Sequence, residues 1–89
     1  MKALTVEIKN EAGLHARPSS KFVEVTSKYD SEITVHTDNE AVNGKSIMGL
    51  MLLGAEKGRR LKLVANGVDE HQLLEALRQL VEEEKFNEE

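Results

Sequence analysis

The chain has 89 residues, no cysteine and a formal net charge of −4 at pH 7. This length gives one small domain, the lack of cysteine excludes disulfides and thiolate metal sites, and the negative charge argues against non-specific nucleic-acid binding. No segment has the apolar length of a membrane span or the pattern of a signal peptide, so we expect a mature cytoplasmic protein without membrane insertion.

The first half of the chain alternates between strand and helix patterns. Apolar and polar residues alternate over 4–8, which predicts a half-buried strand. Apolar residues then recur at helical spacing and predict a helix over 16–27. Alternation returns at 33–36 and predicts a second strand, and Ala41-Val42 is long enough only for a short third strand.

The second half repeats the alternation with two further helices. Ser46 is a natural N-cap for a short helix that runs from Ile47 to about Leu53. Residues 61–65 alternate and predict a fourth strand. Asp69, with Gln72 three residues later, fits a capping box at the start of a final helix. The apolar stripe of that helix comprises Leu73, Leu74, Leu77, Leu80 and Val81.

The order of these elements, βαββαβα, predicts an α+β fold in a single domain over residues 1–89. Short strands with period-2 patterning favour a four-stranded antiparallel sheet with one covered face, and three amphipathic helices can cover it as an open-faced β-sandwich. The charge is uneven, because residues 69–89 contain eight acids and two bases, a net of −6. We expect residues 82–89 to form a frayed acidic tail.

The stretch GLHARPSS, residues 13–20, carries the strongest chemical signal. A helix that starts at Ala16 places His15 at the N-cap, next to backbone N–H groups that have no intrahelical acceptor. Pro18 suits a first turn, and the Arg17 guanidinium favours phosphate oxygens. The N–H groups of Ala16 and Arg17 and the helix dipole predict an anion site around a neutral, nucleophilic imidazole.

The other histidines show no comparable pattern. A lone exposed histidine is usually plain surface, and we expect this of His36 on the open sheet face and of His71 in the first turn of the last helix. For His15 itself, the glycine, arginine and helix-entry proline favour a functional role over plain surface. Histidines and carboxylates do not share metal-ligand spacing, so we expect neither a metal nor a cofactor.

Two motifs together resemble the HPr family, the histidine-containing phosphocarriers of the bacterial phosphotransferase system. GLHARPSS resembles the family's active-site signature, and NGKSIMGLM, residues 43–51, resembles its regulatory-serine segment. Their spacing, the chain length and the element order match over essentially the whole chain. The resemblance implies that enzyme I passes a phosphoryl group to Nδ1 of His15, that Arg17 stabilises it, and that enzyme II A components receive it for sugar uptake. Such a carrier has no turnover of its own.

The resemblance also implies a regulatory role for Ser46. In many members of the family, an HPr kinase/phosphorylase modifies the matching serine, and a transcriptional regulator is then a further candidate partner. From its position alone, Ser46 is equally an ordinary helix cap. We expect an outward-facing docking patch for these partners, although partial core packing is an alternative for its helical members. The patch comprises Leu14, Ile47, Met48 and Met51.

Two positions depart from the family pattern. Ala12 replaces a residue that is often Ser or Asn, and Glu24 replaces a base found in some members.

Three alternative functions remain open. They are a carrier in a nitrogen-related phosphotransferase branch, a regulatory binding module that acts through phosphorylated Ser46, and a stand-alone phosphotransferase or phosphatase. Carboxylates that could bind Mg²⁺ are missing near His15 in the sequence, which argues against the last. We expect a monomer.

Overall fold

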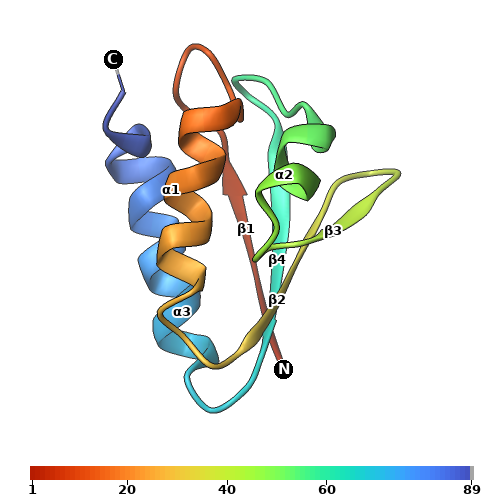
Figure 1. The fold of residues 1–89 in the computed structure, drawn as a ribbon, viewed down its shortest axis with the longest axis vertical. Coiled ribbons are helices and arrows are strands. Elements are labelled where there is room, and N and C mark those ends of the chain that lie inside the picture. The colour runs from red at the N-terminus through yellow and green to blue at the C-terminus, as the bar shows by residue number, and fades with distance from the viewer. Residues whose placement is uncertain (89) are drawn as a thin grey trace.

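The computed structural model describes residues 1–88 and confirms the predicted order of elements (Figure 1). The last helix continues through a π-helical turn as far as Glu83, and the chain then kinks into a short final turn whose residues have positive φ. Within residues 1–88, no helix combines the length and apolar character needed to cross a membrane. The elements are β1 (Lys2–Glu7), α1 (Ala16–Thr26), β2 (Glu32–His36), β3 (Ala41–Asn43), α2 (Ile47–Leu53), β4 (Arg60–Asn66), α3 (Glu70–Arg78), η1 (Gln79–Glu83) and η2 (Lys85–Asn87).

The strands form one antiparallel sheet in the order β1-β4-β2-β3, as an open-faced sandwich requires. Leu63 of β4 pairs with Leu4 of β1 on one side and with Val35 of β2 on the other. Side chains alternate between the two faces of a strand, so these apolar residues point toward the helices. The next pair along, His36 and Lys62, lies on the uncovered face, as predicted for His36.

The three helices cover one face of the sheet, and α1 and α3 lie side by side across it (Figure 1). Each helix buries the apolar stripe that its sequence spacing predicts. Phe22 of α1, Leu50 of α2 and Leu77 of α3 have no exposed surface. They meet Val35 and Leu63 of the sheet in a single core, which holds the first turn of α1 in a fixed place.

The C-terminal segment differs from the expected frayed tail. Within residues 82–88 the chain forms the end of η1, a bend at Glu84 and the short η2, and Phe86 is completely buried. The Lys21 ammonium donates a 2.6 Å hydrogen bond to the Phe86 carbonyl. Burial of this aromatic side chain and the hydrogen bonds beside it dock the acidic segment, because its charged side chains can remain in water while the apolar ring is buried. Residue 89, also part of that expectation, lies outside the described residues.

The predicted capping box at Asp69 is replaced by a different contact. The Asp69 carboxylate accepts hydrogen bonds from the backbone N–H groups of Asp30 and Ser31 and from the Ser31 hydroxyl. The Ser31 hydroxyl, followed by the Asp30 N–H, holds the pKa of the Asp69 carboxyl below its ordinary value. At the start of α3, the Glu70 carboxylate instead accepts from the Gly67 N–H at 3.1 Å. Asp69 therefore ties α3 to the turn before β2.

Candidate phosphoryl site at the start of the first helix

A glycine turn fixes the entry into α1. Gly13 has a φ of +76°, in the left-handed region that favours glycine, and an added Cβ would lie 2.5 Å from the Ala55 carbonyl oxygen. The same oxygen accepts a 2.8 Å hydrogen bond from the Leu14 N–H. This contact turns the Leu14 side chain into the core, where it is 3% exposed. The prediction that Leu14 contributes to a docking surface is therefore wrong.

His15 is the N-cap residue of α1, as predicted. Its backbone is extended, with φ −97° and ψ −162°, and its side chain makes no capping hydrogen bond, so the imidazole is not used to cap the helix. The side chain is 45% exposed. Its carbonyl accepts the first helical hydrogen bond from the Ser19 N–H at 3.0 Å. The N–H groups of Ala16 and Arg17 precede that bond, and Pro18 has none to donate.

Arg17 adds a permanent positive charge to this helix start. Its side chain is exposed in the first turn of α1, two residues beyond His15. Within residues 1–88, no carboxylate lies within ion-pair distance of its guanidinium. The cation also lies at the positive end of the helix dipole, an unfavourable place for it. Both features suit a group whose partner is an incoming anion.

A contact that the sequence did not predict brings the C-terminal segment to His15. One carboxylate oxygen of Glu88, Oε2, lies 3.1 Å from His15 Nε2, and the other, Oε1, lies 3.4 Å from it. The buried Asn10 amide donates from Nδ2 to Glu88 Oε1 at 3.0 Å and to the Gly13 carbonyl at 2.8 Å. The candidate site thus brings together the turn at Gly13, the start of α1 and the C-terminal segment up to Glu88.

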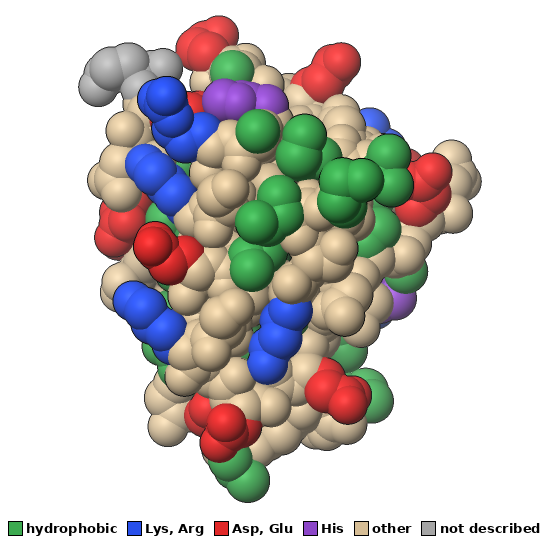
Figure 2. Space-filling model, viewed as in Figure 1, with side chains coloured by type: hydrophobic (Ala, Val, Ile, Leu, Met, Phe, Trp, Pro, Cys, Tyr) green, Lys and Arg blue, Asp and Glu red, His purple; other side chains and the backbone are tan. Residues whose placement is uncertain are grey.

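Ser46 and α2 form the second predicted feature. The Ser46 side chain accepts a 3.0 Å hydrogen bond from the Gly49 N–H, so it is the N-cap of α2. Leu50 is fully buried. The exposed apolar residues of α2 are Ile47, Met48, Met51 and Leu52, at 40%, 69%, 42% and 77% exposure. Because α2 contacts α1, hydrophobic side chains gather beside the helix that begins at His15 (Figure 2).

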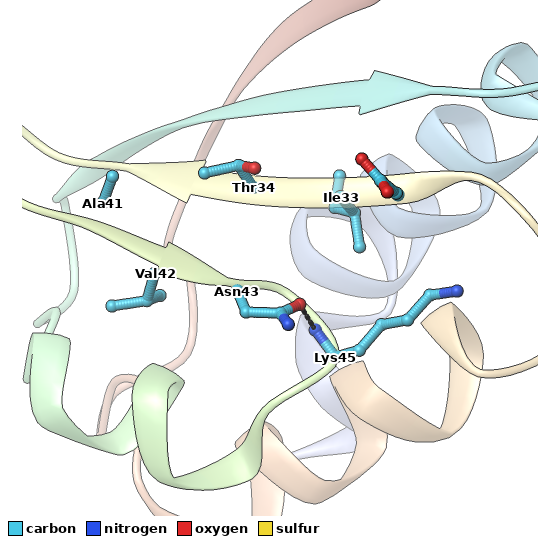
Figure 3. A pocket seen from close by; sticks show the side chains of 7 residues that line it. Ile33, Thr34, Ala41, Val42, Asn43 and Lys45 are labelled. Carbon is cyan, nitrogen blue, oxygen red and sulfur yellow. Dashed lines mark hydrogen bonds between the residues drawn. The ribbon is translucent and has the colours of Figure 1, made fainter.

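A hollow of about 380 Å³ lies elsewhere, along β2 and β3 (Figure 3). Asn43 and Lys45 line it, and the neighbouring Gly44 carbonyl accepts a 3.0 Å hydrogen bond from Thr26, the last residue of α1. The hollow is therefore at the opposite end of α1 from His15. In the described part of the chain, no group of three or more His, Cys, Asp or Glu residues could hold a metal ion. The candidate site is an exposed corner, open to another macromolecule.

Comparison with known proteins identifies the family. The model of the PTS HPr component phosphorylation site matches residues 2–83. The phosphocarrier protein HPr of Neisseria meningitidis serogroup A is 47% identical over 77 residues, which is 86% of each chain. The HPr-like protein Crh of Halalkalibacterium halodurans is 43% identical over 79 residues, covering 89% of this chain and 94% of Crh.

Solved structures agree with the sequence relatives. HPr from Thermoanaerobacter tengcongensis superposes with a TM-score of 0.93 at 53% identity, covering 100% of this chain and 99% of that one. A structure described as an HPr dimer from the same organism gives a TM-score of 0.74 at 50% identity, covering 96% of this chain and 98% of that one. The chain therefore belongs to the HPr family, the phosphocarrier proteins of the phosphotransferase system.

Proposed function

We propose that this protein accepts a phosphoryl group on Nδ1 of His15 from phosphorylated enzyme I and passes it to enzyme II A components during sugar uptake. The observation that carries the proposal is an exposed imidazole at the N-cap of α1, in a helix whose first turn carries Arg17. The lone pair of Nδ1 attacks phosphorus, and the bond to the donor atom breaks and returns its electron pair to the donor. The reverse sequence delivers the group to the acceptor.

The helix start supplies positioning and charge neutralisation, which are the main needs of phosphoryl transfer. The N–H groups of Ala16 and Arg17 lie before the first helical hydrogen bond and can donate to phosphate oxygens. The Arg17 guanidinium can donate two parallel hydrogen bonds to the same oxygens. Both stabilise the charge on the phosphoryl group without holding it covalently, so the group remains transferable.

The direct test incubates the protein with phosphoenolpyruvate and enzyme I and locates the added mass by mass spectrometry. We expect one phosphoryl group on His15, stable in base and lost in mild acid, as is typical of a phosphoramidate. Acid-stable label on a serine, or label on His36 or His71, would contradict the proposal. Transfer from the labelled protein to an enzyme II A component of the sugar branch, compared with one of the nitrogen branch, then identifies the pathway.

Replacing Arg17 with alanine should slow phosphorylation of His15 by about 10- to 150-fold, because a charge-assisted hydrogen bond contributes roughly 1.5–3 kcal/mol. The melting temperature should stay the same or rise slightly, since the variant removes a cation from the positive end of α1. Stopped-flow transfer rates and thermal unfolding measure the two effects. Lys28→Ala, which removes an exposed cation outside α1, is the control. A large loss of stability with a normal rate would make Arg17 structural.

Phosphorylation of Ser46 should slow phosphoryl transfer to His15 without unfolding the domain. A phosphate there adds about −1.5 to −2 charges beside the exposed apolar residues of α2 and opposes docking of an acidic enzyme I surface. Ser46→Asp should reproduce part of the effect, and more strongly at low salt. Ser46→Ala should remove only the helix cap and lower the free energy of unfolding by about 0.5–2 kcal/mol. Equal transfer rates for wild type and Ser46→Asp at low salt would leave Ser46 as a helix cap alone.

A second candidate function is a regulatory binding module that acts through phosphorylated Ser46. The similarity to Crh and the exposed apolar side chains of α2 favour it. HPr kinase/phosphorylase would then modify Ser46, and the modified α2 surface would bind a transcriptional regulator. Binding of the regulator to the phosphoserine form, with no labelling of His15 by enzyme I, would support this function over the carrier. In both cases we expect a cytoplasmic protein. We also expect a monomer, and size-exclusion chromatography with light scattering tests this oligomeric state.

A further inference from the structure

We infer that Met48 and Met51 form an oxidation site on α2, at which peroxide blocks the docking of enzyme I. The inference rests on the proposed function and adds a reversible covalent modification to it. The chain contains three methionines and no cysteine, so thioethers are its only sulfur groups. The third methionine, Met1, lies at the end of the molecule opposite the start of α1, where its amino group pairs with Glu70 at 3.1 Å (Figure 1).

Both methionines of α2 are open to solvent and share one face of the helix. The exposed fraction is 69% for Met48 and 42% for Met51. The two residues are three positions apart, a spacing that places helical side chains next to each other. Leu50, which is fully buried, holds the other face of α2 in the core. A small neutral oxidant can therefore reach both thioethers without any opening of the fold.

Hydrogen peroxide converts a thioether into a sulfoxide by transfer of one oxygen atom. A sulfur lone pair forms a bond to one peroxide oxygen, the O–O bond breaks, and the departing hydroxide takes the proton of the transferred oxygen and leaves as water. Sulfur is oxidised and the peroxide is reduced by the same pair of electrons. A methionine sulfoxide reductase with a dithiol reverses the change, which releases water and leaves the dithiol as a disulfide. The modification can therefore be made and removed.

A sulfoxide lacks the properties that suit these side chains to docking. An unmodified methionine is flexible, apolar and polarisable, so it adapts to partner surfaces of different shape. The sulfoxide oxygen is a polar acceptor, and burying it in an interface without a donor is unfavourable. Oxidation changes two of the four large exposed apolar residues of α2, which are Ile47, Met48, Met51 and Leu52 (Figure 2). Docking of enzyme I on this surface is therefore weakened.

The fold and the chemistry at His15 should survive oxidation of α2. The helix is capped by the hydrogen bond from the Gly49 N–H to the Ser46 side chain, at 3.0 Å, which involves neither methionine. Its contact with the core is made by Leu50, which peroxide does not modify. His15 and Arg17 belong to α1 and its N-cap. Oxidation should therefore raise the KM of enzyme I for this protein and leave kcat nearly unchanged.

The test treats the protein alone with hydrogen peroxide, removes the oxidant with catalase, and then measures phosphorylation of His15 by enzyme I and phosphoenolpyruvate. Peptide mapping by mass spectrometry should find one added oxygen atom on each methionine. The KM should rise about 5- to 100-fold, as expected when an unpaired polar group is buried in an interface. Methionine sulfoxide reductase should restore it. An unchanged KM for protein oxidised at both Met48 and Met51 would overturn the inference.

The matched control carries Met48→Leu and Met51→Leu together. Leucine keeps an apolar side chain of similar volume, and peroxide does not oxidise it. Each protein is compared with its own untreated sample, so an effect of the substitutions on the basal rate cancels. The control still contains Met1 and His15, and its KM should be the same before and after treatment. Equal sensitivity of the control and the wild type would place the damage elsewhere and overturn the inference.

Two further measurements separate docking from folding and from transfer. Calorimetric titration of the same samples with enzyme I needs no phosphoryl donor, and the Kd should weaken by the same factor as the KM. Thermal unfolding should show the oxidised protein folded at the assay temperature, and an unfolded sample would overturn the inference. Labelling of untreated protein on His15 tests the proposed function separately, because it requires no oxidation. Failure of that labelling, with a Kd that still responds to oxidation, would reject the proposed transfer and keep the oxidation site.

Discussion

Replacing His15 with alanine should abolish phosphorylation by enzyme I and phosphoenolpyruvate completely. The variant removes the only ring that lies at the N-cap of α1, beside Arg17 and the N–H groups of the first turn. Ser19, the serine closest along α1, cannot replace it, because its hydroxyl is buried. Fold stability should change little, since the imidazole is exposed and does not cap the helix. Radiolabel incorporation and thermal unfolding measure the two results.

The matched controls are His36→Ala and His71→Ala. His36 lies on the uncovered sheet face, paired with Lys62, and His71 is exposed near the start of α3. Neither lies at the N-cap of a helix of the described chain, so both variants should be labelled as fast as wild type. Full labelling of His15→Ala, or loss of labelling in either control, would assign the phosphoryl group to a different residue and exclude the proposed site.

Replacing Phe86 with alanine should be the most destabilising of the changes considered. Truncating a fully buried Phe removes about 3–5 kcal/mol of stability, against a total of about 5–15 kcal/mol for a typical domain. For a domain of this size, the melting temperature should fall by about 12 °C or more. The variant should also disturb the Glu88 contact, because Phe86 anchors the segment that carries it. Calorimetry and denaturant unfolding measure the loss.

Val68→Ala is the control for apolar truncation at the surface. Its side chain is 90% exposed and precedes α3, so the change should alter the melting temperature by very little. If Phe86→Ala melts like Val68→Ala, the C-terminal turn contributes nothing to the core. Loss of labelling in Phe86→Ala at temperatures where the protein is folded would instead show that the docked C-terminal segment contributes to phosphoryl transfer.

Most of the fold could be predicted because the local patterns agree with the tertiary structure. The period-2 runs became β1, β2 and β4, and the helical spacing gave α1 and α2 within one or two residues of their observed bounds. The prediction of a capping box at Asp69 was wrong for a reason that cannot be read from the sequence. The carboxylate found donors in the turn at Ser31, which is distant along the chain. Side-chain contacts of this range leave no periodic signal.

The positions of His15 and Arg17 at the start of α1 were predicted, and the contact between His15 and Glu88 was missed. His15 and Arg17 are adjacent in the sequence, so a local motif could place them. Leu14 belongs to the same motif, but its burial depends on a hydrogen bond to the remote Ala55 carbonyl. Glu88 lies close to His15 in space but 73 residues away along the sequence, in a segment whose composition predicts disorder. Phe86, the single aromatic residue in that segment, was the available signal that the end of the chain docks.

The sheet order has a consequence for how the chain acquires its structure during synthesis. β4, which lies between β1 and β2, is the last strand to be made, so β1 has no partner until residue 66 has left the ribosome. The hairpin of β2 with β3 can form early, but its strands pair over only a few residues, so it gives little support to the rest of the sheet. Contacts between distant parts of a chain slow folding, and unpaired strands are prone to aggregate. The nascent chain must therefore stay soluble with β1 exposed until β4 has emerged and paired with it.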